Sequence, residues 1–191
     1  MSSAKTSARL MVATLILLIL AACNTSTKPE NIYQKVTDAK LKAGDSIPAP
    51  KDSAILTVTG KIGAKNSGDS IQMDLSTIES VGLVDYKVTD PFEKRPTTFR
   101  GVLMSSLLDV WKVDSDATTL EMVALNDYKV DVPISELRQY PVIFALQQDG
   151  QYMPVSTRGP AMLVYPYDHF QFDRQKYDDR WIWQIKSIKV K

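Results

Sequence analysis

The chain has 191 residues, of which 44% are hydrophobic and 24% charged, and its 23 lysines and arginines nearly balance its 22 aspartates and glutamates. This length fits about one domain, and a net charge of +1 gives no electrostatic case for nucleic-acid binding. The single cysteine excludes an intrachain disulfide and any site built from several thiolates.

The first 22 residues have the pattern of a bacterial lipoprotein signal peptide. Lys5 and Arg9 precede an apolar run at residues 10–22, which is too short to cross a bilayer but typical of a secretory signal. The run ends in "LAAC", and this motif resembles the bacterial lipobox. The resemblance implies cleavage before Cys23 and lipidation of its thiol and its new amino terminus. The alternative is an ordinary signal peptide followed by an incidental cysteine.

Lipidation of Cys23 has consequences for the mature chain of 169 residues. With no free thiol left, we expect neither a cysteine nucleophile nor a cysteine-ligated metal. Loss of Lys5 and Arg9 leaves 21 basic against 22 acidic side chains, which again excludes nucleic acid as a partner. The next residue is Asn24, not the aspartate that resembles an inner-membrane retention signal in enteric bacteria. We therefore predict a lipid anchor in a bacterial membrane, facing the periplasm, and in the outer membrane rather than the inner one.

Residues 23–53 are predicted to be a tether between the anchor and the folded domain. The stretch after the cysteine is polar, contains three prolines and has few large apolar side chains. Patterns typical of packed strands and helices begin near residue 54. The folded domain is therefore predicted to span residues 54–191.

The first half of this domain predicts short strands and short helices. Ser76 precedes Glu79 by three residues, which is the spacing of a capping box at the start of a short helix. The leucines and the tryptophan of residues 102–111 fall on one helical face and predict a second helix. The predicted strands are residues 54–60 and residues 83–89, the latter ended by Pro91.

The second half predicts two hairpins and a final strand. Apolar and polar residues alternate on both sides of Asn126-Asp127, a pair that tolerates the positive φ of a type I′ turn. A polar pair also invites a catalytic interpretation, but turn chemistry accounts for it without one. The other predictions are a hairpin at residues 142–155 that turns at Asp149-Gly150 and a strand at residues 180–190 with a β-bulge near Lys186-Ser187.

Few residues of a catalytic type occur. The sequence has no glycine-rich phosphate loop, no GxSxG or HExxH motif and no cluster of metal ligands. His169 is the only histidine, and Asp168 beside it would point to the opposite face of an extended chain. The segment from Tyr165 to Arg180 lacks glycine and mixes aromatic with charged side chains. It either lines a site or covers one end of the sheet as a charged surface loop.

Six short motifs follow one another across the domain. They are "LTVTGKI", "DLSTIESVG", "FRGVLMSSLLD", "VALNDYKVDVPISEL", "GPAMLVYP" and "IKSIKV". In this order, over residues 54–190, they resemble the molybdopterin-binding domain of sulfite-oxidase-type oxidoreductases, which include the methionine sulfoxide reductase catalytic subunit. The resemblance implies a mixed α+β fold with a mainly antiparallel sheet and short helices.

Two features of this family are missing from the sequence. Its enzymes hold molybdenum through the pterin dithiolene and one cysteine thiolate, which would lie within "VDYKVTDPFEK", a stretch without cysteine. In "GPAMLVYP", Met162 stands where the family usually has an arginine. We therefore expect no metal ligands and no cofactor, with molybdopterin retained only if the metal is held in an unusual way.

The missing residues favour a binding or sensory module, held at the membrane by the lipid on Cys23, for a small anionic molecule or a periplasmic or membrane protein. One alternative is a molybdopterin-dependent oxidoreductase that acts on a small oxo substrate with unusual metal ligation. Another is a metal-free enzyme that uses the 165–180 segment. Arg158 is equally consistent with a cleft residue and a solvated loop charge. The residues expected around the cleft are Arg100, Arg158, Tyr165, Asp168, His169 and Arg180.

Overall fold

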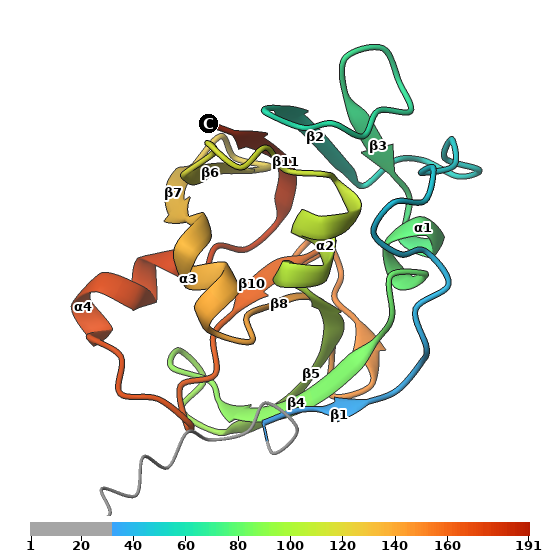
Figure 1. Cartoon of the computed structure of the whole chain (residues 1–191). Helices are drawn as coiled ribbons and strands as arrows, with labels where there is room; N and C mark the ends of the chain where they lie inside the picture. The colour runs from blue at the N-terminus through green and yellow to red at the C-terminus, as the bar shows by residue number, and fades with distance from the viewer. Residues whose placement is uncertain (1–31) are drawn as a thin grey trace, which may run out of the picture.

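The computed structural model describes residues 32–191, which form two β-sheets and several short helices (Figure 1). The predicted signal peptide, the lipobox and Cys23 lie outside the described residues. Within the described part of the chain, no helix combines the length and the apolar character needed to cross a membrane. The α+β fold class with mainly antiparallel pairing is confirmed.

The first sheet has six strands, and every pairing in it is antiparallel. Its order is β1-β4-β5-β8-β10, and β9 pairs with β8 off this path. The strands are β1 (Gln34–Lys35), β4 (Val84–Thr89), β5 (Pro96–Leu103), β8 (Ile143–Gln148), β9 (Gln151–Tyr152) and β10 (Met162–Val164). The long β4–β5 pair carries half of the side chains that line the candidate site.

The second sheet has five strands in the order β3-β2-β11-β6-β7. Only the β11–β2 pair is parallel. The C-terminal strand β11 lies between β2, from the start of the domain, and β6, from its middle. The strands are β2 (Leu56–Gly60), β3 (Ile71–Met73), β6 (Thr119–Ala124), β7 (Lys129–Pro133) and β11 (Ile185–Val190).

Short helices pack on and between the sheets (Figure 1). They are α1 (Leu75–Glu79), α2 (Met104–Val110), α3 (Ile134–Gln139), α4 (Arg174–Tyr177) and a 3₁₀ turn, η2 (Asp178–Arg180). The predicted apolar face of α2 is confirmed, because Leu107, Leu108 and the following Trp111 are completely buried. These side chains join both sheets into one core.

The folded domain begins earlier than the sequence pattern predicts. Ile32, Leu41 and Ile47 are buried against the domain, although the residues between them are mostly exposed. The backbone N–H of Val36 donates to the carbonyl of Leu83 at 2.8 Å, next to the short β1–β4 pairing. The expectation of a free tether is therefore wrong for residues 32–53. Widely spaced apolar anchors hold this polar stretch in place.

Helix α1 starts at a different residue from the one predicted. Its N-cap is Asp74, whose carboxylate accepts from the Thr77 N–H at 2.8 Å. The same carboxylate accepts from the N–H groups of Lys51 and Asp52 at 2.8 and 3.1 Å. Burial alone would raise the pKa of Asp74, but these hydrogen bonds outweigh it and hold the pKa well below its usual value. Asp74 therefore joins the N-terminal segment to α1, and the predicted capping box at Ser76 is wrong.

Both predicted hairpins are present, and one has a different turn. The Asp149-Gly150 turn has positive φ at both residues, as a two-residue type I′ loop requires. In the β6–β7 loop only Asp127 has a positive φ, of 65°. The Asp127 N–H donates to the Ala124 carbonyl at 3.0 Å, so that this is a three-residue loop with one left-handed position.

Two strand irregularities shape the sheets. The register of β11 against β6 shifts between Ile185 and Ser187, which confirms the predicted bulge, although the strand begins only at Ile185. A second shift lies between Arg100 and Gly101 of β5, opposite β8. A Cβ atom on Gly101 would lie 2.1 Å from the Phe144 carbonyl oxygen, so only glycine permits this close approach. Gly101 is thus inside strand β5.

Candidate functional site

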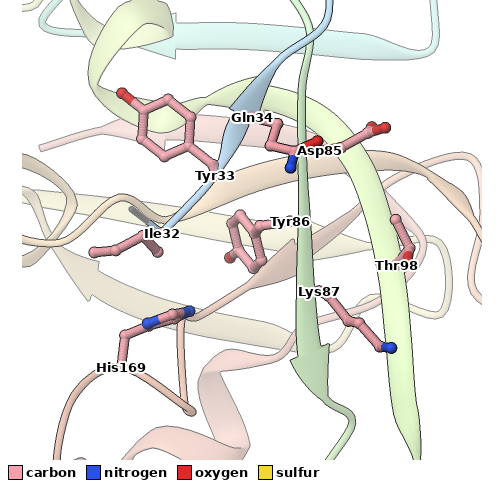
Figure 2. Close-up of a pocket in the computed structure, with 8 residues that line it drawn as sticks. All are labelled: Ile32, Tyr33, Gln34, Asp85, Tyr86, Lys87, Thr98 and His169. Carbon is pink, nitrogen blue, oxygen red and sulfur yellow. The ribbon is translucent and has the colours of Figure 1, made fainter. Parts of the chain in front are cut away.

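A cleft of about 550 Å³ lies over the β1 and β4 side of the first sheet (Figure 2). Its side chains come from the N-terminal segment, from β4 and β5, and from the loop after β10. The lining residues are Ile32, Tyr33, Gln34, Asp85, Tyr86, Lys87, Thr98 and His169. We call this hollow the β4 cleft.

Arg100 is held at the edge of the β4 cleft by a cross-strand ion pair. Asp85 and Arg100 are partners in the β4–β5 register, and the guanidinium donates two hydrogen bonds to the carboxylate at 2.7 and 2.8 Å. The bonds to Asp85 raise the pKa of Arg100 above its ordinary value. Arg100 lines an adjoining hollow that shares Asp85 and Thr98 with the β4 cleft. Arg100 thus lies at the border between two hollows of the first sheet.

Lys87 is the cation that remains available in the β4 cleft. It is exposed, lies two residues after Asp85 on the same face of β4, and is the register partner of Thr98. No carboxylate of residues 32–191 lies within ion-pair distance of its ammonium group. Its sequence context, an alternating strand, gave no signal that distinguishes it from any other surface lysine.

His169 reaches the β4 cleft because Asp168 fixes its loop. The Asp168 carboxylate accepts from the N–H and the hydroxyl of Thr89, at 2.7 and 3.1 Å. The His169 ring lies at the end of the cleft nearest Ile32 (Figure 2). Asp168 and His169 are thus neighbours of the site with separate roles, because the carboxylate ties the loop to β4 and the imidazole faces the hollow.

A buried tyrosine, Tyr86, lies beside the β4 cleft and points to the opposite face of β4 from Asp85 and Lys87 (Figure 2). Tyr86 is 3% exposed, and its hydroxyl donates to the carbonyl of Val164. Burial raises the pKa of Tyr86 well above its ordinary value, so that it stays protonated and cannot act as a base. Among the lining residues, no hydroxyl is hydrogen-bonded to the imidazole of His169. The cleft therefore has groups suited to binding, without an assembled nucleophile and base.

Arg158 lies elsewhere, beneath an aromatic surface. It is buried, forms an ion pair with the fully buried Asp90, and lies 3.4 Å from a carboxylate oxygen of Glu93. Its guanidinium also lies 4.7 Å from the centroid of the Trp183 ring. Burial works against the charge on Asp90, but the hydrogen bond from Arg158 and those from backbone N–H groups lower the pKa of Asp90 overall. Arg158 is neither a cleft residue nor a solvated loop charge.

Tyr165 and Arg180 belong to the interior of the 165–180 segment. Tyr165 is completely buried, its ring packs edge-on against Phe172 and Tyr177, and burial raises the pKa of its hydroxyl. Arg180 forms an ion pair with Glu136 of α3, and burial lowers its pKa. Of the six residues expected around a cleft, Arg100 and His169 border the β4 cleft, Asp168 supports it, and Arg158, Tyr165 and Arg180 lie elsewhere.

The residues present do not fit a molybdenum cofactor of the kind that the resemblance implies. Met162 is completely buried in β10, so that the expected cationic contact is replaced by apolar packing. The stretch expected to supply the thiolate contains Asp85 and Asp90, and each of them forms an ion pair with an arginine. Thr89 in the same stretch donates a hydrogen bond to Asp168. Among residues 32–191, no three histidine, cysteine or acidic side chains lie together as a metal site requires.

Comparison with known proteins supports the fold. No family model matches the sequence, and no curated protein matches it. Among solved structures, the chain is similar to the sulfane dehydrogenase SoxCD from Paracoccus pantotrophus, with a TM-score of 0.54 and 11% identity. The match covers 71% of this chain and 37% of that one. At this identity the likeness is one of fold alone.

Proposed function

We propose that the chain is a lipid-anchored periplasmic protein whose domain binds a small anionic molecule in the β4 cleft. The anchor is the lipid on Cys23, for which the signal peptide and the lipobox-like motif argue. The domain uses a sulfite-oxidase-like fold as a binding scaffold, without the molybdenum chemistry of that family. We propose the outer membrane as the site of the anchor, because the residue after the lipidated cysteine is Asn24 and not the aspartate that resembles an inner-membrane retention signal.

The observation that carries the proposed ligand class is the environment of Lys87. Its ammonium group has no carboxylate partner within the described residues, whereas Asp85 next to it is neutralised by Arg100. Gln34, Thr98 and His169 add hydrogen-bonding groups around the same hollow. A lysine without an ion-pair partner among residues 32–191, beside side chains that donate hydrogen bonds, favours an anion with a carboxylate, sulfate or phosphate group.

The experiment measures anion binding to the mature protein by isothermal titration calorimetry. Sulfate, phosphate and citrate serve as probes, and we expect at least one of them to bind saturably. Lys87→Gln should weaken that binding about tenfold or more, because a charged hydrogen bond contributes about 1.5–3 kcal/mol. Lys189→Gln is the matched control, since Lys189 is an exposed strand lysine of the other sheet. Equal losses in the two variants, or no binding of any probe, would contradict the proposal.

The second candidate is an oxidoreductase, and the likeness to the fold of a sulfane dehydrogenase is what favours it. It would require metal ligation without a thiolate, because the one cysteine of the chain is at position 23. The buried Met162 and the paired Asp85 and Asp90 argue against such a site. A binding module is therefore the function that the residues support best.

A further inference from the structure

A second hollow lies where the loops of the two sheets meet. Its volume is about 240 Å³, and it is bordered by the β4–β5 turn, the β6–β7 loop and the segment that leads into β11. Its lining includes the aromatic residues Phe92, Tyr128 and Trp183 and the polar residues Asn126, Asp179 and Gln184. We call this hollow the aromatic groove. It shares no residue with the β4 cleft.

Two aromatic rings are exposed in the groove, and both are held on ordered turns. Phe92 is 45% exposed and Tyr128 is 48% exposed. The buried Asp90 carboxylate accepts from the Phe92 N–H at 2.8 Å, and the Asn126 side chain accepts from the Tyr128 N–H at 3.1 Å. The Phe92 ring meets Trp183 edge-on, with 5.1 Å between the ring centroids. The rings therefore offer flat apolar faces that need little ordering before a ligand binds.

Polar groups border the same rings. The amides of Asn126 and Gln184 and the carboxylate of Asp179 line the groove, and Asp179 has no ion-pair partner among residues 32–191. The indole N–H of Trp183 is buried and has no acceptor in the part of the chain that the structure describes. The groove thus combines apolar faces with both hydrogen-bond donors and hydrogen-bond acceptors.

We propose that the aromatic groove binds one sugar ring of a neutral glycan. A pyranose has a flat face of C–H groups that packs on aromatic rings, and a rim of hydroxyls that both donate and accept hydrogen bonds. The Asn126 oxygen already accepts from the Tyr128 N–H, and the Gln184 amide N–H already donates to the Val155 carbonyl at 2.6 Å. The Asp179 carboxylate and the Gln184 amide oxygen can therefore accept from such hydroxyls, and the Asn126 amide N–H groups can donate to them. The volume is below the roughly 300–1,000 Å³ of sites for drug-sized ligands, which suits a single ring.

A cationic peptide is the competing ligand for an aromatic groove with an acidic rim, and the contacts disfavour it. The Trp183 ring already has the guanidinium of Arg158 at 4.7 Å. Asp178 is engaged by the Tyr167 hydroxyl at 2.9 Å and lies 3.8 Å from Arg174. Asp179 is then the one carboxylate left for a cation, so the groove offers little net attraction for a basic segment.

The experiment titrates the mature protein with maltotriose, cellotriose and tri-N-acetylchitotriose, and with trilysine, by isothermal titration calorimetry. We expect saturable binding of at least one trisaccharide and none of trilysine. Phe92→Ala and Tyr128→Ala should each weaken the trisaccharide at least tenfold. Tyr152→Ala, which removes a ring that is 52% exposed outside the groove, is the matched control and should leave the affinity unchanged.

Unfolding midpoints measured on the same variants establish that each one folds. Asp179→Asn provides a variant that leaves both rings in place, and it should also weaken the trisaccharide. Lys87→Gln should have no effect on it, which separates this site from the β4 cleft. Binding of trilysine in place of sugars, absence of binding by all three trisaccharides, or unchanged sugar affinity in both ring variants would overturn the proposal.

Discussion

Asp90 and Arg158 lie 68 residues apart in the sequence and form an ion pair that is almost entirely removed from solvent. The pair joins the β4–β5 turn to the loop before β10, and the guanidinium also packs on the Trp183 ring. Each ion has further partners, because Asp90 accepts from the N–H groups of Phe92 and Glu93. One buried contact therefore sets the position of the turn that carries the exposed ring of Phe92.

Removing Arg158 should strongly destabilise the domain. Arg158→Met leaves the Asp90 carboxylate buried without its cation, a change that costs about 3–5 kcal/mol in comparable pairs. Arg100→Met is the matched control, because the Asp85–Arg100 pair is partly exposed and such pairs contribute about 0–1 kcal/mol. The free energy of unfolding in urea measures both. A similar, small loss in the two variants would show that the Asp90–Arg158 pair does not hold the fold.

The stability of the domain should fall at acidic pH. The pKa values of Asp74 and Asp90 are lowered in the folded state, so the unfolded chain binds protons first as the pH drops. Their contribution is complete above the unfolded aspartate pKa of about 3.9 and is lost as the pH falls from there toward the folded values. Urea unfolding followed from pH 7 down to about pH 2 measures this loss.

Asp74→Asn tests how much the N-cap residue Asp74 contributes to the loss of stability at acidic pH. At pH 7 the variant should be less stable than the wild type, although asparagine is itself a good N-cap residue. The amide has one acceptor oxygen and no charge, so it cannot replace the carboxylate that accepts from the Thr77, Lys51 and Asp52 N–H groups. The stability of the variant should then depend less on pH below pH 5 than that of the wild type. An unchanged pH dependence in the variant would mean that Asp74 is not one of the groups that titrate on acid unfolding.

The effect of a substitution in the β6–β7 loop on stability should depend on whether the new residue accepts the backbone conformation, and not on whether it keeps the charge. Asp127→Val places a β-branched residue at φ 65° and should cost about 1–2 kcal/mol. Asp127→Asn removes the exposed ion pair with Lys186 but keeps a residue that accepts this conformation, and should change little. Thermal unfolding compares the two. A larger loss of stability in Asp127→Asn than in Asp127→Val would show that the charge of Asp127, and not its turn conformation, stabilises the loop.

The lipid anchor is tested by one substitution outside the described residues. Cys23→Ser removes the thiol that receives lipid, so the protein should accumulate as uncleaved precursor or as soluble protein. Membrane fractionation and the mass of the mature amino terminus measure the result. Wild-type processing and membrane retention of the variant would rule out a lipoprotein.

Local chemistry explains which elements could be predicted from the sequence. The Asp149-Gly150 turn and the β11 bulge were correct, because positive-φ residues and a change in apolar parity are visible over a few positions. The α1 start was wrong because Asp74 and Ser76 are both good N-cap residues. Only the tertiary contacts of Asp74 with the backbone of Lys51 and Asp52 decide between them.

The candidate site could not be predicted from the sequence, because it is formed by contacts between residues that lie far apart in the chain. Residues 32–53 look like a tether because their buried side chains, such as Ile32 and Leu41, are few and far apart. The pairing of Asp85 with Arg100 requires the β4–β5 register, and this pairing leaves Lys87 without an ion-pair partner among residues 32–191. The sequence left Arg158 open between a cleft residue and a solvated loop charge, because its buried partner Asp90 lies on a distant turn.

The central claim is that this fold operates here without a molybdenum site, and the metal content of the purified mature protein tests it most directly. Protein from a molybdenum-replete host is analysed by inductively coupled plasma mass spectrometry, and pterin is sought by fluorescence after oxidation. With no thiolate in the domain and a buried methionine at position 162, we expect far less than one molybdenum per chain and no pterin signal. About one molybdenum per chain, together with pterin, would contradict the account and establish the oxidoreductase alternative.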